Sequence, residues 1–225
     1  MLTSFGGSYK KNANMKSTGK CQEMIAKNNG MDECQEMWAS VSALFKSPFI
    51  QPNDEMEAYL KNVLKASWLQ GLDAQGSFVG SMPNGLGCLR FQCSGDVAWT
   101  MFELRQLIPA MKIMLSKDDV GGLEGVMAFV KNLGLKEIAE LQSHGCTAHY
   151  CRQTEGQVVY VPIGWVAAER SVKGVLVYGL RKTVMFSSPV SYENYGLLAG
   201  LYEASKKPVD KMKATLQLLQ PPEAE

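Results

Sequence analysis

The segment 157–169 constrains the fold of this chain more than any other stretch. It begins with the apolar run Val158–Val161, and Pro162 and Gly164 follow directly. A short β-branched run stopped by Pro and Gly is typical of a buried strand that ends in a sharp turn, and not of a helix. Trp165 then adds a large apolar side chain. We therefore predict a strand, a corner and a second strand, with Pro162, Gly164 and Trp165 defining the corner.

Further strand patterns lie on both sides of this segment. They are short, rich in β-branched and aromatic residues, and separated by Gly, Pro, Asn and Asp turns. They cover residues 77–82, 87–93, 97–104, 147–152 and 174–186. In 87–93, Cys88, Arg90 and Gln92 alternate with Leu89, Phe91 and Cys93. This alternation predicts a strand with one apolar face and one face partly open to water.

Helical patterns surround and interrupt these strands. Apolar residues recur at spacings of three and four in 20–72, 105–143 and 191–225. We therefore predict an α+β protein whose β core, residues 73–190, contains the helical insertion 105–143. A helical region, 20–72, precedes the core and C-terminal helices, 191–225, follow it. Residues 1–19 are rich in Gly, Ser, Asn and Lys, which predicts a flexible arm.

Composition excludes several classes of protein. Hydrophobic residues make up 46% of the 225 residues, which is enough for a sizeable core, and the net charge of +1 gives no overall attraction to nucleic acid. The six cysteines are too few for a disulfide scaffold in a chain of this length. The first twenty residues lack a signal-peptide core, and no apolar run is long enough to span a bilayer. We expect a soluble protein with reduced thiols in an intracellular, reducing compartment, while organelle import stays open.

Two of the strand blocks, taken together, resemble one known family. In Leu89–Phe102 an apolar strand carrying Gln92 runs into a Gly turn and then into a strand with Trp99 and a final Phe. In Gly156–Trp165 a Gly turn is followed by an apolar strand and Pro-x-Gly-Trp. Both blocks resemble the strand motifs of JmjC-type, cupin-like oxygenases. The resemblance implies a partial or complete double-stranded β-helix, the jelly-roll core of that family, with Trp99 among its defining residues.

The resemblance also implies that the chemistry of the family has been lost. Active members bind Fe(II) through a His-x-Asp/Glu pair and a later His, which leaves coordination positions open for oxygen and a keto acid. These ligand positions fall on Met82, Asn84 and Ala167, and the family's keto-acid lysine falls near Val97. None of these residues matches the family pattern. The resemblance therefore implies a degenerate member that uses no cofactor and is not an enzyme.

Another set of metal-ligand residue types lies just before the corner. His144, Cys146, His149 and Cys151 fall within eight residues, and both types are ligands for zinc. Their spacing fits one tetrahedral site poorly, because such sites usually draw two pairs from separated turns. We favour a half-buried strand with small apolar thiols over a metal site.

Basic residues follow the corner. Arg170, Lys173, Arg181 and Lys182 form a candidate interaction surface for RNA or an acidic partner, with Trp165 nearby. The alternative, which we favour, is a solvated strand edge protected by Lys and Arg.

These patterns lead to one functional hypothesis and two alternatives. The main hypothesis is a non-catalytic structural or interaction subunit of an oligomer or larger assembly, because a helical region up to residue 72 leaves a barrel with edges that need covering. One alternative is a nucleic-acid-binding or coat-type jelly-roll protein that uses the basic arm. The other is a metal-dependent oxygenase with unconventional ligands from His144, His149, Cys151 or Glu169.

Overall fold

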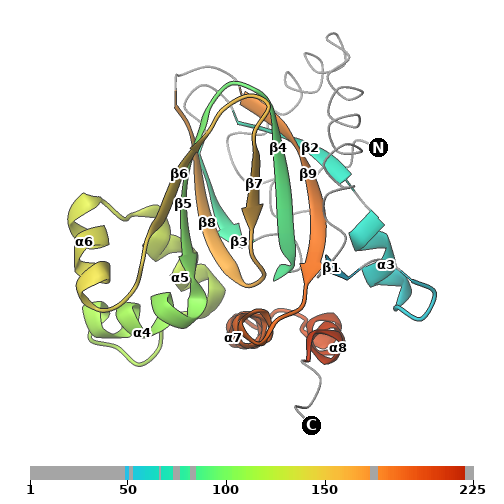
Figure 1. Ribbon diagram of the computed structural model, residues 1–225. Helices are drawn as coiled ribbons and strands as arrows, with labels where there is room; N and C mark the ends of the chain where they lie inside the picture. Colours follow the sequence, from blue (N-terminus) through green and yellow to red (C-terminus); the bar gives the residue numbers. More distant parts are fainter. Residues whose placement is uncertain are drawn as a thin grey trace.

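The described part of the chain is an α+β fold of two antiparallel sheets and six helices (Figure 1). The structure is a computed structural model, which describes residues 49–50, 53–65, 67–72, 77–81, 85–172 and 177–220. The predicted arm 1–19, the predicted helices up to residue 46, Met82, Asn84 and Lys173 lie outside these residues. The α+β prediction is confirmed.

The first sheet contains five strands. They are β1 (Phe49–Ile50), β2 (Ser67–Leu72), β4 (Gly87–Ser94), β7 (Val158–Val161) and β9 (Val177–Phe186). Their order is β1-β9-β4-β7, and β2 also pairs with β9. The second sheet contains β3 (Ser77–Ser81), β5 (Val97–Glu103), β6 (His149–Gln153) and β8 (Trp165–Ser171) in the order β3-β8-β5-β6.

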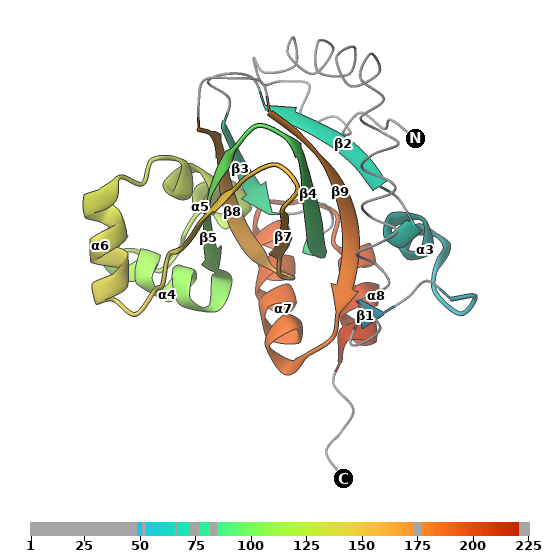
Figure 2. The same cartoon turned by 45° about the horizontal axis from the view of Figure 1, so that its top comes forward.

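The strand pairs are nested along the chain. β2 pairs with β9, β3 with β8, β4 with β7 and β5 with β6, all antiparallel. The two sheets lie face to face and are not closed into a barrel (Figures 1 and 2). Segments far apart in sequence therefore become neighbours, and Figure 2 shows β2 running beside β9.

The space between the sheets is filled by the inward-facing side chains of both. The buried apolar residues in it are Leu72, Cys88, Val97, Trp99, Met101, Val161, Ala167 and Val177. Trp99 is the largest and is fully buried. Alternation along each strand places these side chains on one face and their sequence neighbours on the other.

The prediction of a half-wet face on β4 is wrong. Leu89 and Phe91 are buried on one face, and Arg90 and Gln92 are each 0% exposed on the other. A buried guanidinium needs a counter-charge, and Arg90 finds one in Glu169 on β8 of the facing sheet. The polar residues of β4 thus point into the interior and not toward water.

Six helices of the described residues surround the sheets. They are α3 (Ala58–Lys65), α4 (Leu104–Leu115), α5 (Gly122–Lys131), α6 (Leu135–Ser143), α7 (Pro189–Ala204) and α8 (Asp210–Leu219). In Figure 1, α4, α5 and α6 lie beside the second sheet, and α7 and α8 lie below both. Helical residues pack with Phe102 and Val166 in one large cluster. Helices α4 to α6 fall where the helical insertion was predicted, and α7 and α8 fall in the predicted C-terminal segment.

The predicted helical region 20–72 is wrong at its C-terminal end. Helix α3 ends at Lys65, and Ser67–Leu72 is the strand β2, which runs antiparallel to β9 from Ser67 opposite Lys182 to Leu72 opposite Val177. Pairing with the backbone of β9 overrides the helical spacing of the apolar residues here, because propensity is weaker than tertiary context.

The predicted corner between β7 and β8 is confirmed. Gly164 has φ +69°, and its amide donates to the Gly85 carbonyl at 3.0 Å. A Cβ atom at Gly164 would lie 2.6 Å from the carbonyl carbon of Asn194 in α7. The corner therefore requires glycine both for its backbone conformation and for the close approach of α7.

We expect Gly164→Ala to lower the free energy of unfolding by at least about 2 kcal/mol, since left-handed strain and a backbone clash act together. Gly156→Ala is the matched control, because Gly156 has φ +79° with nothing within 4 Å of the added Cβ. That control should lose only the conformational part, about 1–2 kcal/mol. Urea denaturation of both variants measures the difference, and equal losses would show that the contact with α7 contributes nothing.

Candidate functional site

A buried ion triad lies between the two sheets. Arg90 on β4 donates from Nη1 to Glu169 Oε2, and Arg181 on β9 donates from Nη2 to Glu169 Oε1. All three side chains are at most 1% exposed. Two guanidinium groups therefore share one carboxylate, and both carboxylate oxygens are occupied. The triad carries one net positive charge inside the protein.

Trp99 and Gln153 complete this polar centre. The Arg90 and Arg181 guanidinium carbons lie 5.5 Å and 5.6 Å from the Trp99 ring centroid, within the range of a cation–π interaction. The Trp99 indole N–H donates to Gln153 Oε1 at 3.0 Å. Gln153 Nε2 in turn donates to the backbone carbonyls of Arg90 and Gln157. The centre thus ties together β4, β5, β6, β8 and β9.

Ala167 stands at the position where the family resemblance would place the third metal ligand, and its methyl group is packed in the interior. Ala167 is 0% exposed and belongs to the apolar cluster between the sheets. Two residues further along β8, the carboxylate of Glu169 is held by the two arginines. The interior at this level is a packed apolar and ion-paired centre.

The His144–Cys151 segment is spread over several environments. His144 caps the end of α6, Cys146 is buried in the helical cluster, and His149 on β6 stacks near Trp165 with ring centroids 4.8 Å apart. Within the described residues, no group of three or more His, Cys, Asp or Glu side chains is arranged to hold a metal ion. Of these four residues only His149 and Cys151 lie on a strand, and Cys146 is fully buried ahead of it.

Burial keeps the two thiols of this segment protonated to higher pH than a free thiol. Burial raises the pKa of Cys146 to about 11, and burial likewise raises the pKa of Cys151. Metal binding needs the thiolate, so a raised pKa works against it. Cys88, Cys146 and Cys151 are free thiols, whereas Cys93 is disulfide-bonded. The expectation of reduced thiols does not hold for Cys93.

Arg170, Arg181 and Lys182, the described members of the predicted basic surface, do not form one surface. Arg181 is buried in the triad, while Arg170 on β8 is exposed. Lys182 is half-buried on the opposite face of β9 from Arg181, because neighbouring residues of a strand point to opposite sides. Burial lowers the pKa of Lys182. The interaction surface predicted from Arg170, Lys173, Arg181 and Lys182 is therefore wrong for Arg181.

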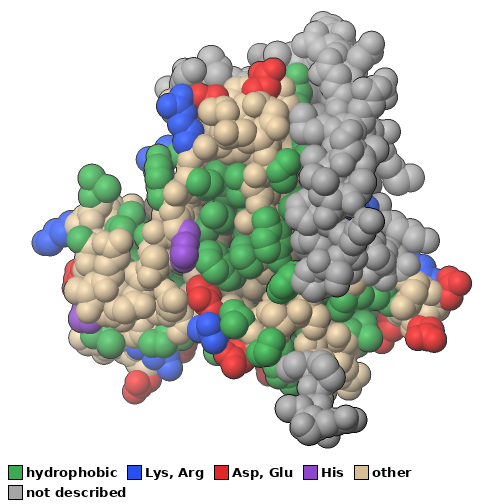
Figure 3. All heavy atoms as spheres, in the orientation of Figure 1, with side chains coloured by type: hydrophobic (Ala, Val, Ile, Leu, Met, Phe, Trp, Pro, Cys, Tyr) green, Lys and Arg blue, Asp and Glu red, His purple; other side chains and the backbone are tan. Residues whose placement is uncertain are grey.

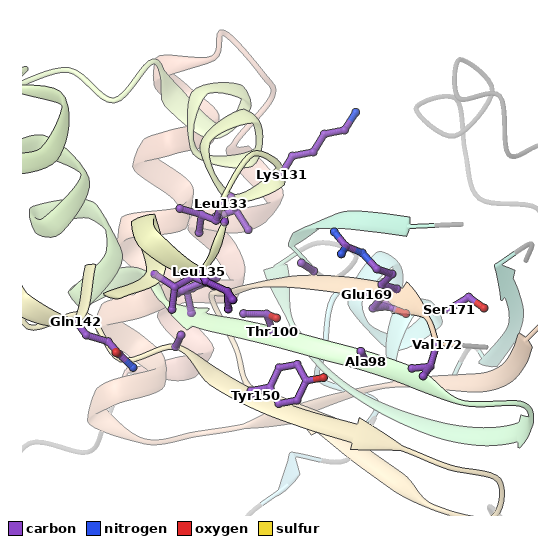
Figure 4. Close-up of a pocket in the computed structure, with 17 residues that line it drawn as sticks. Ala98, Thr100, Lys131, Leu133, Leu135, Gln142, Tyr150, Glu169, Ser171 and Val172 are labelled. Carbon is purple, nitrogen blue, oxygen red and sulfur yellow. The ribbon is translucent and has the colours of Figure 1, made fainter. Parts of the chain in front are cut away.

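A groove on the outer face of the second sheet was missed by the sequence reasoning. It has a volume of about 640 Å³ and lies between β5, β6 and β8 on one side and α5, the α5–α6 turn and α6 on the other (Figure 4). Its floor carries Ala98, Thr100 and Ala168. The small size of these outward-facing residues is the sequence signal that was available. It becomes informative only when the strands are known to be neighbours.

The space-filling view shows a second apolar area. In Figure 3 hydrophobic side chains gather between β6 and β7, on the side where the two sheets part. Cys151, Val159 and Trp165 are the partly buried apolar residues that pack against the inter-sheet cluster.

Comparison with models of known protein families gave no match, and neither did comparison with curated proteins. No helix in the described part of the chain is long and apolar enough to cross a membrane.

Proposed function

We propose that this chain is a non-catalytic structural or interaction subunit built on a degenerate double-stranded β-helix of the JmjC/cupin-like type. The observation that carries the proposal is the engagement of Glu169 by two buried arginines. Glu169 is the one carboxylate near the position where the resemblance would place a metal ligand. Each of its oxygens accepts a hydrogen bond from a guanidinium group, so its charge is already compensated within the triad.

The strand order supports the proposed β-helix. In a jelly roll, a long hairpin is folded over so that its first strand pairs with its last, and the inner strands pair in the same nested way. The pairs β2·β9, β3·β8, β4·β7 and β5·β6 follow this rule. The antiparallel contacts of β4 with β9 and of β5 with β8 join the pairs into two sheets.

The packing between the sheets supports a structural role. Ala167 has no donor atom and is buried against apolar neighbours. Trp99, which lies opposite Glu169 in the strand register, and the triad fill the space between the sheets two residues along β8 from Ala167. The ion pairs and the packed tryptophan join the two sheets to each other, as suits a scaffold. An oxygenase would need an open site in the same place.

The surface supports an interaction role. Leu135 on α6 is 88% exposed and Tyr150 on β6 is 70% exposed. β6 is also an edge strand, with one side of its backbone unpaired in the sheet order. Large exposed apolar side chains beside an open strand edge are features that partner subunits commonly cover.

One sample tests the proposal. The chain is isolated under mild, chelator-free conditions from cells that make it, and its native mass, metal content and nucleic-acid content are measured together. We expect a particle heavier than the 24.7 kDa chain, without stoichiometric iron, zinc or nucleic acid. A known iron oxygenase isolated in parallel controls for metal loss.

Any other result favours one of the alternative functions or contradicts the assembly role. Stoichiometric metal would favour an oxygenase with unconventional ligands. A particle with bound RNA, released by salt, would favour the coat-type alternative. A mass equal to that of the single chain would contradict the assembly role.

A further inference from the structure

The floor of the groove on the second sheet changes character along β5 and β8. Phe102 lies opposite Val166, and both are fully buried under the helices. The next outward-facing row pairs Thr100 with Ala168 and with the exposed Tyr150. The row after it pairs Ala98 with Arg170 and with Arg152, which forms an ion pair with Asp96. Along β5 and β8, a large covered pair is therefore followed by small residues and then by Ala98 beside the exposed Arg170. The floor therefore runs from an apolar, closed end to a charged, open end.

The walls of the groove are apolar. They carry Val130, Leu133, Leu135 and Ile138 from α5, the turn and α6. In Figure 4, Leu133 and Leu135 stand above the strand that carries Thr100, while Gln142 lies at one end and Val172 near the other. A recess of about 640 Å³ with apolar walls and a few polar groups has the size and lining of a small-molecule site.

The ionised side chains that reach this groove are cationic. Lys131 at the end of α5 and Arg170 on β8 both line it and are exposed. Among the described residues neither forms an ion pair. Glu169 also lines the groove, but its carboxylate is directed to the other side of the sheet, into the triad. The nearest carboxylate on the helical wall is that of Glu137, which accepts from the backbone amide of Gly134 at 2.9 Å. An anionic group at the open end of the groove, beside Arg170 and Lys131, would be attracted by both cations.

We infer that the groove binds a single-chain amphiphile with an anionic head, and specifically a long-chain carboxylate. The apolar chain lies on Ala98, Thr100 and Ala168 against the leucine wall, and the carboxylate lies near Lys131 and Arg170. This chemistry uses every distinctive feature of the groove: its narrow floor of small residues, its apolar walls and its cationic rim. The inference does not rest on the assembly role, although Leu135 and Tyr150 belong to both surfaces. Ligand titration tests the groove and native mass tests the assembly, so the failure of one is distinguishable from the failure of the other.

Dodecanoate below its micelle concentration is the probe, added to the full-length chain and followed by titration calorimetry and by amide shifts in NMR spectra. We expect saturable binding of one molecule, with the largest shifts at Ala98, Thr100 and Ala168. Dodecyltrimethylammonium, which has the same chain and the opposite charge, should bind about fivefold or more weakly at low salt. The difference should shrink as salt is added, because both cations are exposed.

Three sets of variants distinguish binding in this groove from non-specific hydrophobic binding. Lys131→Gln with Arg170→Gln should weaken dodecanoate binding about fivefold. Lys112→Gln with Lys136→Gln, two exposed lysines outside the groove, should leave it unchanged. Ala98→Leu should fill the floor and abolish the shifts, and its thermal melting curve shows that it still folds. No saturable binding, equal affinity for the cationic probe, or wild-type affinity in Ala98→Leu would each overturn the inference.

Discussion

Replacing Glu169 with Gln is expected to lower the free energy of unfolding by about 3–5 kcal/mol. The variant keeps the shape of the side chain but removes the one negative charge between Arg90 and Arg181. Both guanidinium groups are at most 1% exposed, so water cannot replace the lost counter-charge. Breaking a buried ion pair from one side costs far more than the net stability of the intact pair, because an uncompensated charge remains behind. Urea or guanidinium denaturation of the purified variant measures the loss.

Two further variants test whether the loss of stability comes from the unpaired buried arginines. Glu193→Gln removes a carboxylate that pairs with Arg105 at the surface, and it should cost no more than about 1 kcal/mol. Replacing all three members of the triad with apolar residues of similar size should restore most of the stability lost in Glu169→Gln. If Glu169→Gln is as mild as Glu193→Gln, the triad is hydrated and the buried arrangement described above is wrong.

Trp99→Ala is expected to cost a similar amount, about 3–5 kcal/mol, by a different route. The change removes the largest side chain between the sheets and leaves a cavity that the paired strands cannot close. It also removes the indole N–H that donates to the side-chain oxygen of Gln153, and the aromatic face that lies near both arginines. The same denaturation experiment, supported by calorimetric melting, measures it.

Trp165→Ala is the control for this prediction. Trp165 is also a tryptophan at a predicted fold-defining position, but it is only half-buried, at the margin of the apolar cluster between the sheets. Its truncation should therefore cost clearly less than that of Trp99. Equal losses would show that burial at the polar centre is not what makes Trp99 important.

The effects of the Glu169 and Trp99 substitutions on stability should not be additive. Trp99 lies within 6 Å of both guanidinium groups, and residues in contact usually show coupling energies of about 0.5–3 kcal/mol in double-mutant cycles. We expect the double variant Glu169→Gln, Trp99→Ala to lose less stability than the sum of the single losses.

Local patterns predicted much of the secondary structure. The strands at 77–82, 87–93 and 97–104, the corner at Gly164 and the helical insertion all lie close to where the apolar spacing and the turn residues indicated. The incorrect predictions share one cause, which is a contact with residues far away in the sequence. Ser67–Leu72 has apolar spacing that also fits a helix, and only the free edge of β9 makes it a strand. Arg90 and Gln92 have side chains that usually face water, and Arg90 is buried only because Glu169 on the facing sheet supplies its counter-charge.

The candidate sites likewise divide into those that depend on local sequence and those that depend on distant contacts. The sequence alone showed that the ligand positions implied by the family resemblance hold Met82, Asn84 and Ala167, because identity at a position is a local property. It indicated neither the ion triad nor the groove. Glu169 is 79 residues from Arg90 and 12 from Arg181, and the groove joins β5 and β8 to α5 and α6. Contacts at such separations depend on strand register and helix packing, which the periodicity of one segment does not contain, so only the tertiary structure decided them.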